Sequence, residues 1–419
     1  MGMNREKTVA KRGSLLSLLF TFAVDNLGAT IVFPIFAPLF LDPSQGLLSE
    51  ALSEGARGTL LGLFLAAFPL SQFFFSPLLG DYSDHNGRKP ALLITTSFTF
   101  FGYILAAYSI HTHALIPLFI ARLIMGVGAG NLSICMSSMA DMSTSSKKKK
   151  HYFSLGSAIA GVTFVLGPLL GGKLSDPAIS NYFHPSFPMW IGAMLSGINL
   201  LFLFFAFEES LDEKSEADFD FLKGVHNILS VVKKSRIRNL FLVYLLYLLA
   251  WNTFFQFIPA YLVENFSFTN SNIGDVCALM GVFWIVGTGV IYKLLHNHIK
   301  DRPFLITTLV LFSLGTFSLP FFSSITHFIL LVGFCTMISG VVWPLCTTAI
   351  SDAADARMQG KVLGVSQSVL SLSLVVSALV GGAFLNISVK VPFLAGACFL
   401  LAAAALTIIC KFSDESRSN

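Results

Sequence analysis

Long apolar segments alternate with short polar ones along the whole chain. Each apolar segment is about as long as a membrane-spanning helix, which needs roughly 20 residues. None shows the alternating pattern of a membrane barrel strand. The segments lie at about residues 14–40, 59–80, 91–110, 114–141, 152–173, 187–207, 239–263, 273–292, 303–321, 326–350, 361–385 and 391–410. The pattern therefore predicts an all-α polytopic membrane protein with twelve transmembrane helices.

Composition narrows the class further. Of 419 residues, 54% are hydrophobic and 12% are charged, whereas a soluble globular protein has about 25% charged residues. This excludes a soluble enzyme, a nucleic-acid-binding protein and a secreted disulfide scaffold. The six cysteines all fall in apolar segments without metal-ligand spacing, and no nucleophile, HExxH or phosphate-loop motif occurs. We therefore expect no enzyme activity, no metal and no cofactor.

Basic residues indicate the orientation. If the N-terminus is cytoplasmic, the outer loops hold only Arg57, Lys173 and Lys390, and Arg122 lies within a helix. The other 23 of the 27 lysines and arginines then lie on the inner side. Such a bias places both termini in the cytoplasm. Compact loops and short tails favour the bacterial inner membrane.

A polar stretch near the midpoint divides the chain in two. We predict an N-terminal six-helix bundle (residues 1–207), a cytoplasmic linker (208–238) containing an amphipathic segment, and a C-terminal six-helix bundle (239–419) with a short tail. The fifth apolar segment ends in GPLLGG and the eleventh in ALVGGA, a faint internal repeat. Two pseudo-symmetric bundles are typical of secondary transporters whose substrate site lies between the repeats.

The segment GDYSDHNGRKP, residues 80–90, follows the second apolar segment and resembles the signature loop of the major facilitator superfamily. The matching positions are Gly80, Asp84, Gly87, Arg88 and Lys89. The resemblance implies a twelve-helix transporter in which this loop is a conformational latch in the outward-open state. Asp84 would meet the N-terminal end of the eleventh helix, and Arg88 would bridge to Asp141. The alternative is an ordinary cytoplasmic turn.

Two charges lie deep within predicted helices. Asp25 is about eleven residues, or roughly 16 Å, from the inner end of its helix, and Arg122 is about nine residues, or roughly 14 Å, from the outer end. The segment ARLIMGVGAG around Arg122 resembles the superfamily's fourth-helix motif. Because buried charges are costly without a partner, we expect Asp25 and Arg122 to form a pair that couples transport to protons. The alternative is a static ion pair that fixes helix packing.

The remaining motifs favour one branch of the superfamily. GPLLGG resembles the motif of drug/proton antiporters, whose residues here are Gly167, Pro168, Gly171 and Gly172. Gly167 and Gly171 are spaced to form a close-packed face, and Pro168 would bend the helix; ordinary small-residue packing is the alternative. Asp25, Gly28 and Pro34 are spaced as in tetracycline-exporter-like proteins. Arg357, Gln359 and Gly360 also match that group. Tetracycline exporters carry further intramembrane acids, so we do not expect tetracycline to be the substrate.

Uncharged polar side chains within the helices are candidates for the substrate cavity. Each also has a simpler interpretation as a hydrogen bond between helices. The candidates are Asn26, Gln72, Asn131, Trp251, Asn252, Gln256 and Trp343. Together with 42 phenylalanines, they predict a mostly apolar cavity that suits an amphipathic, neutral or weakly cationic organic molecule.

The sequence thus predicts a monomeric secondary transporter that moves a small organic molecule by alternating access, with proton-coupled export as the first choice. Sodium coupling, or none, stays open. An importer of a nutrient, siderophore or metabolite is the main alternative, and a ligand sensor that does not transport is a second one.

Overall fold

The structure is a computed structural model that describes residues 2–45, 47–211, 235–353 and 359–409. These residues form helices joined by turns, and no β-strand occurs among them. Twelve helical segments of this part of the chain are long and apolar enough to span a membrane. The predicted fold class is confirmed.

Six spans form the N-terminal bundle, and two of them are interrupted. The first consists of α1 (Gly2–Thr30) and α2 (Phe33–Leu41), with Pro34 in the first turn of α2, where its missing N–H is tolerated. The fourth consists of α5 (Leu115–Gly128) and α6 (Asn131–Asp141), separated within a glycine-rich run. The uninterrupted spans are α3 (Glu54–Asn86), α4 (Arg88–His111), α7 (Ser146–Ser175) and α8 (Phe187–Ala206).

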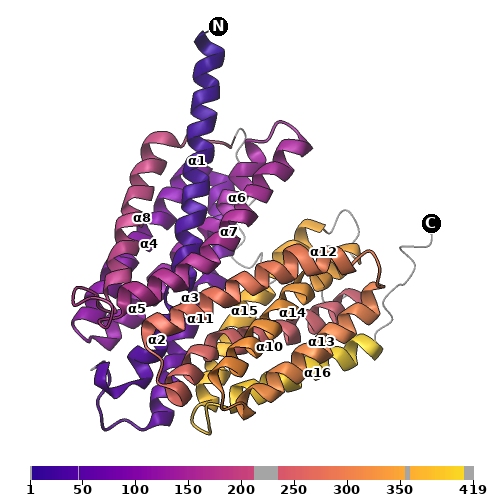
Figure 1. Cartoon of the computed structure of the whole chain (residues 1–419). Coiled ribbons are helices and arrows are strands. Elements are labelled where there is room, and N and C mark those ends of the chain that lie inside the picture. The colour runs from indigo at the N-terminus through magenta and orange to yellow at the C-terminus, as the bar shows by residue number, and fades with distance from the viewer. Residues whose placement is uncertain (1, 46, 212–234, 354–358, 410–419) are drawn as a thin grey trace.

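The other six spans form the C-terminal bundle (Figure 1). They are α10 (Ser235–Phe266), α11 (Asn270–Val286) continued by a π-helical turn (Gly287–Ile291) and α12 (Tyr292–Leu295), α13 (Asp301–Ser318), α14 (Ile325–Asp352), α15 (Gln359–Phe384) and α16 (Val391–Ile409). Most of the predicted linker, including its amphipathic segment, and Arg357 lie outside the described residues. The predicted domain boundaries therefore stay predictions.

The two bundles meet closely at one end. We call the end at which α1 begins the basic end, and the other the opposite end. At the opposite end α3 packs on α15 and α7 on α11. A Cβ atom added to Gly62 would lie 2.8 Å from the Cα of Gly382, and one added to Gly172 would lie 2.8 Å from the Cα of Gly274. Only glycine permits helix backbones to approach this closely.

Polar contacts accompany both close approaches. The Lys173 ammonium lies 2.6 Å from the Asp275 carboxylate, joining α7 to α11. Asn386, just after α15, donates from its side-chain amide to the Thr59 hydroxyl of α3 at 2.7 Å. These contacts close the opposite end between the bundles.

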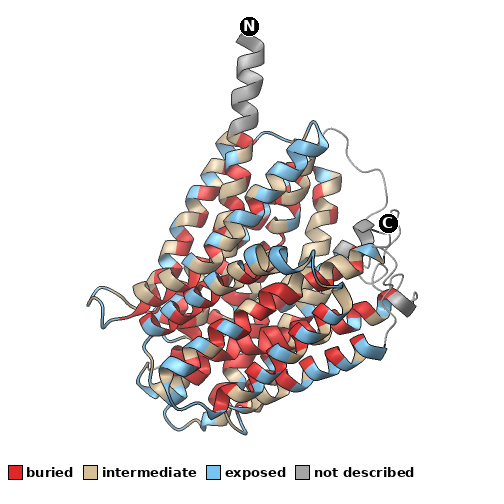
Figure 2. Ribbon diagram, turned by 45° about the vertical axis from the view of Figure 1, so that its right-hand side comes forward, coloured by how far each residue is buried: buried red, intermediate tan, exposed pale blue. Residues whose placement is uncertain are grey.

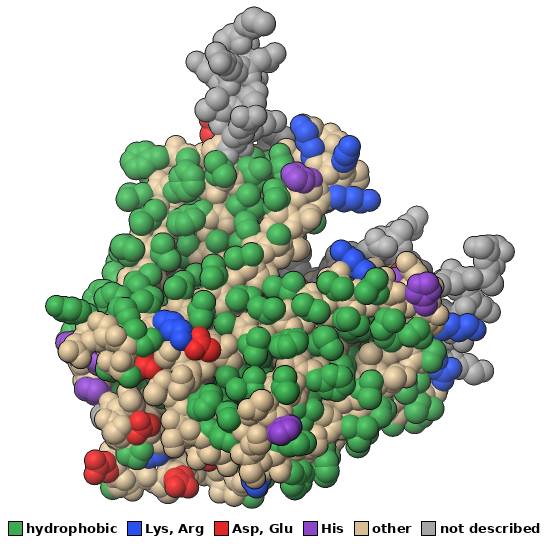
Figure 3. All heavy atoms as spheres, in the orientation of Figure 1, with side chains coloured by type: hydrophobic (Ala, Val, Ile, Leu, Met, Phe, Trp, Pro, Cys, Tyr) green, Lys and Arg blue, Asp and Glu red, His purple; other side chains and the backbone are tan. Residues whose placement is uncertain are grey.

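The buried core has two parts. The larger apolar cluster contains residues of both bundles, such as Phe36 and Phe64 from one and Tyr247 and Phe254 from the other. The smaller cluster, around Phe22, contains only N-terminal residues. Buried positions accordingly concentrate away from the N-terminus (Figure 2), and the surface is hollowed between the bundles at the basic end (Figure 3). The bundles are thus joined at the opposite end and separated at the basic end.

Candidate functional site

The signature loop forms a charge network at the basic end. Gly87 links α3 to α4 with φ of 111°, a conformation that only glycine adopts readily. The guanidinium of Arg88, 7% exposed as a side chain, lies 2.5 Å from the Asp84 carboxylate and 2.8 Å from that of Asp141. The Arg88–Asp141 pair is present as the sequence suggested. Asp84 instead pairs with Arg88, so its expected contact with the eleventh helix is replaced here by one within the loop.

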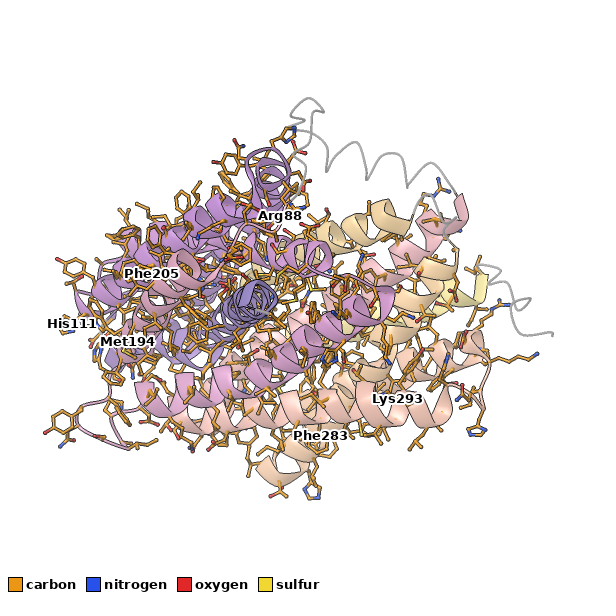
Figure 4. All side chains as sticks on the ribbon, turned by 90° about the horizontal axis from the view of Figure 1, so that it is seen from above. Arg88, His111, Met194, Phe205, Phe283 and Lys293 are labelled. Carbon is orange, nitrogen blue, oxygen red and sulfur yellow. The ribbon has the colours of Figure 1, made fainter. Side chains whose placement is uncertain are left out.

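All members of this network belong to the N-terminal bundle. Viewed along α1, Arg88 lies on that bundle, whereas Lys293 and Phe283 lie on the other (Figure 4). A Cβ atom added to Gly80 would meet nothing within 4 Å, and the same holds for Gly364 on α15. Both glycines therefore have free space at the separated end, and the latch role of the loop stays a prediction.

Glu209 holds the turn from the other side. Its carboxylate accepts hydrogen bonds from the backbone N–H groups of Arg88 and Lys89 at 2.9 and 3.0 Å, at the N-terminal end of α4. Partial burial would raise the pKa of Glu209, but these bonds and two from Ser210 and Leu211 outweigh it and lower the pKa. A carboxylate at a helix N-terminus also meets the positive end of the helix dipole.

Asp25 is bonded to an amide. Its Oδ1 accepts from the side-chain amide of Asn131 on α6 at 3.4 Å, while its Oδ2 is buried without a partner. Asn131 is fully buried and also bonds the hydroxyls of Thr95 and Thr96 on α4. Asn131 therefore fixes Asp25 against α4 and α6.

Arg122 makes no ion pair with Asp25, which corrects the prediction from the sequence. Its guanidinium lies over the rings of Phe36 and Phe68, 5.3 and 4.9 Å from their centroids. The side chain is buried, and Nε and Nη1 have no hydrogen-bond partner. Counting residues gave both charges the same depth, but the partner of Asp25 lies nine residues, or roughly 14 Å, along the span from Arg122.

The GPLLGG segment is closely packed, and the antiporter role of this motif stays a prediction. A Cβ atom added to Gly167 would lie 3.0 Å from the backbone oxygen of Leu27 in α1, and one added to Gly171 would meet that of Ile31, just after α1. Gly172 faces α11 instead, and the carbonyl of buried Pro168 faces Gly274 of α11. One segment thus packs α7 both within its own bundle and against the other.

Several polar side chains predicted to line the cavity instead join helices within a bundle. Asn252 donates to the Ser373 hydroxyl at 2.9 Å, and Gln256 to that of Ser377 at 3.3 Å, so both tie α10 to α15. Both are buried, like Asn131. Asn26 bonds the backbone of its own helix, and Gln72 is half-buried in α3. For Asn131, Asn252 and Gln256 the geometry favours the alternative of hydrogen bonds between helices.

Aromatic rings fill the interface between the bundles. Phe255 of α10 packs on Phe33 of α2, with centroids 4.7 Å apart, and stacks on Phe164 of α7 at 5.2 Å. Trp251 also stacks on Phe255, with centroids 5.6 Å apart. From Phe164 the contacts continue to Trp284 at 6.1 Å and then to Trp343 at 6.2 Å. We call Phe33, Phe164, Trp251, Phe255, Trp284 and Trp343 the aromatic cluster.

Several of these residues escaped the sequence analysis. The sequence analysis placed Glu209 in the cytoplasmic linker, although its position directly after an apolar segment indicated that it could contact the end of a helix. The phenylalanines of the cluster were hidden among many others. Tyr103 of α4, which lies against Gly28, was also missed, although a glycine three residues after a buried acid indicates a close approach.

Twelve apolar spans in two bundles, closed at one end, with a buried carboxylate and an aromatic interface, define a membrane transport protein. The Major Facilitator Superfamily model matches residues 18–302 and 240–419. The chain therefore belongs to this superfamily of transporters, and it is a multi-pass membrane protein and not an enzyme.

Relatives and solved structures agree with this family assignment. The tetracycline resistance protein, class H, of Pasteurella multocida is 26% identical over 87% of this chain and 87% of its own length. The quinolone resistance protein NorA of Staphylococcus aureus (strain MSSA476) is 24% identical over 94% of this chain and 95% of its own. The crystal structure of the human organic anion transporter MFSD10 (TETRAN) has the same fold, with a TM-score of 0.68, 21% identity, and coverage of 95% of this chain and 99% of that one.

Proposed function

We propose that the protein exports an amphipathic organic compound by alternating access, driven by protons that bind at Asp25. The observation that carries the proposal is the carboxylate of Asp25 in the first span, whose Oδ2 atom is buried without a hydrogen-bond partner. The uncharged aromatic interface between the bundles accompanies it. Relatives named for tetracycline and quinolone resistance support the export direction. In this proposal the basic end faces the cytoplasm, and the protein acts as a monomer in the bacterial inner membrane.

Alternating access is supported by the unequal ends. The opposite end is closed by contacts between glycine backbones, while the basic end has a core of its own in the N-terminal bundle. Rocking the bundles would open the first and close the second, and Gly80 has the free space to admit another helix. The signature loop would then hold the closed basic end as a latch.

The substrate class is supported by the aromatic cluster. None of its six side chains is charged, and rings from α2 and α7 meet rings from α10 and α11. An aromatic ligand that replaces one of these ring contacts gains about 0.5–1.5 kcal/mol per pair beyond area burial. A sugar or a multivalent anion would gain little there.

The test measures accumulation of a panel of amphipathic compounds in cells without their own efflux pumps. The cells express wild type, Asp25→Asn or the control Asp42→Asn at matched levels. Asp42 lies at the opposite end, where the hydrogen-bond partners of its carboxylate within the described chain are the nearby Ser44 and Gln45. We expect wild type and Asp42→Asn to lower accumulation of some compounds, and Asp25→Asn to leave it high.

The other outcomes are equally informative. Unchanged export by Asp25→Asn would show that the coupling proton does not bind at Asp25. A ΔpH-driven assay in inverted vesicles would verify this result. Increased accumulation with wild type would establish import instead. If no compound responds, export of amphipathic compounds is wrong and a dedicated metabolite becomes the better substrate.

A further inference from the structure

Tyr103 lies in a slot between two glycines. Its side chain is 1% exposed in the middle of α4. A Cβ atom added to Gly28 of α1 would lie 1.8 Å from the Tyr103 hydroxyl oxygen, and one added to Gly192 of α8 would lie 2.5 Å from a ring carbon. Any larger residue at either position would displace the ring. The packing therefore fixes the hydroxyl next to α1, three residues beyond Asp25.

Tyr103 and Gly28 also line a small cavity. It measures about 20 Å³, and Asp25, Thr99 and Tyr103 supply its polar lining, while Phe68 and Met125 close it on the apolar side. One water molecule needs about 10–15 Å³ on this measure and two to four polar partners. Asp25, whose Oδ2 atom has no hydrogen-bond partner, is one of the polar residues that line the cavity. Size and chemistry both fit a single water.

We propose that this cavity binds one water molecule that links the Asp25 carboxylate to the Tyr103 hydroxyl, and that Tyr103 is thereby a positioning residue for Asp25. The Thr99 hydroxyl, which donates to the Thr95 carbonyl at 3.2 Å, remains free to accept from this water. Asn131 holds the other carboxylate oxygen, so the water completes a two-sided hold on the group. Its role in transport rests on the function proposed above.

Water fits better than a metal cation. The lining offers one carboxylate and two hydroxyls, fewer oxygens than the six or more that hard cations take. Charged and titratable groups near Asp25 come from three further helices: Tyr103 from α4, Arg122 from α5 and Cys135 from α6. The buried guanidinium of Arg122 would repel a second cation, whereas a neutral water is not repelled.

The water would keep the carboxylate in one orientation between proton uptake and release. Removing the Tyr103 hydroxyl deletes about one hydrogen bond from this arrangement. This loss corresponds to a decrease of roughly 2- to 10-fold in the rate of proton-driven transport. Substrate binding at the aromatic cluster would be unchanged, because Tyr103 makes no ring contact with that cluster among the described residues.

The experiment is infrared difference spectroscopy of the purified full chain in lipid nanodiscs, in ordinary water and in water labelled with heavy oxygen. Asp25→Asn assigns the Asp25 carboxyl band. The test variant is Tyr103→Phe, and the matched control is Tyr108→Phe, since Tyr108 lies on the same helix but is 57% exposed. Gly192→Ala, which keeps the hydroxyl but crowds the ring, is a second test.

We expect one isotope-sensitive water band in wild type and Tyr108→Phe that is lost in Asp25→Asn and Tyr103→Phe. The carboxyl band should move to higher frequency in Tyr103→Phe and Gly192→Ala, because the group loses a donor. The rate of proton-driven transport should fall about 5-fold in Tyr103→Phe, with the substrate dissociation constant unchanged.

A wild-type spectrum without this water band would overturn the proposal. A carboxyl band whose frequency does not change in Tyr103→Phe would overturn it as well. Displacement of the band by sodium but not by choline would replace the water with a cation site and overturn it too. If the spectra respond as expected but Asp25→Asn transports normally, the water site stands and proton-coupled transport through Asp25 fails.

Discussion

The two bundles bury different chemistry. In the N-terminal bundle the buried charged side chains are Arg57, Asp81, Arg88, Arg122 and Asp176. Among the described residues of the C-terminal bundle, no buried side chain is charged, and its buried amides are paired with serines. Buried charge needs partners and costs stability, so its restriction to one bundle indicates a task there that the other does not share.

This difference suggests a division of labour between two similar folds. In the proposed mechanism Asp25 of the N-terminal bundle binds protons, and the Arg88 network of the same bundle braces the basic end. The C-terminal bundle contributes four of the six rings of the aromatic cluster, on α10, α11 and α14. Mutations could then change proton coupling without changing substrate recognition, and substrate recognition without changing proton coupling.

The largest effect expected from breaking this division is on affinity. Phe255→Ala removes the ring that contacts Phe33, Phe164 and Trp251. A substrate that packs on this ring loses one aromatic contact, worth about 0.5–1.5 kcal/mol, so its dissociation constant should rise by up to roughly 10-fold. The pH dependence of transport should not change, because no proton-binding group is touched. Tryptophan fluorescence titration measures the affinity.

Phe317→Ala is the matched control, since Phe317 belongs to the same bundle but is 52% exposed. It should bind substrate like wild type. An altered pH profile in Phe255→Ala, with unaltered affinity, would contradict the separation of recognition from coupling.

A smaller effect is expected on the N-terminal side, from Glu209→Gln. A neutral amide keeps the shape but loses the charge at the start of α4, which should lower the free energy of unfolding by about 0.5–1 kcal/mol at neutral pH. Because folding lowers the pKa of Glu209, its stabilisation is present above the ordinary glutamate pKa of about 4.3. It is lost as the pH falls through the folded-state pKa.

Thermal unfolding of the two proteins between neutral and acidic pH provides the measurement. The difference between wild type and Glu209→Gln should shrink on acidification. Glu208→Gln is the control, because only the backbone of Glu208 makes a described hydrogen bond, to Ser14. Equal losses in both variants would show that the negative charge of the segment matters and the contact with α4 does not.

The twelve spans could be predicted from the sequence because few backbone structures are stable in the hydrocarbon core of a membrane. Every backbone polar group must be satisfied within the helix, so long apolar segments become spans. Close packing at Gly167 and Gly171 was also predictable, since small residues four apart share one helix face. The Arg88–Asp141 pair was predictable only through the family resemblance.

Depth and direction of single side chains were not predictable. Residue counting placed Asp25 level with Arg122, but it cannot show which way a side chain points, and Asp25 points to Asn131 instead. Asn252 and Gln256 were candidates for the cavity, yet both donate to serines of α15 within the bundle. Tyr103 carried no periodic signal, since it lies among other aromatic residues of an apolar helix.

The smallest expected effect concerns Lys173 and Asp275, where the bundles meet. Both side chains are more than a third exposed, and an exposed pair contributes about 0–1 kcal/mol. Lys173→Gln should therefore shift the equilibrium by about 2-fold toward the state open at the opposite end. Distances between spin labels on α7 and α11 would report the shift, and Lys390→Gln at the same end is the control.

Because salt screens exposed charges, the effect of Lys173→Gln should fade at high ionic strength. An effect of 10-fold or more that resists salt would mean that charge, and not the contact of Gly172 with Gly274, holds the bundles together. The C-terminal bundle would then use charge after all, at its edge instead of in its core, and the division between the bundles would apply only to their interiors.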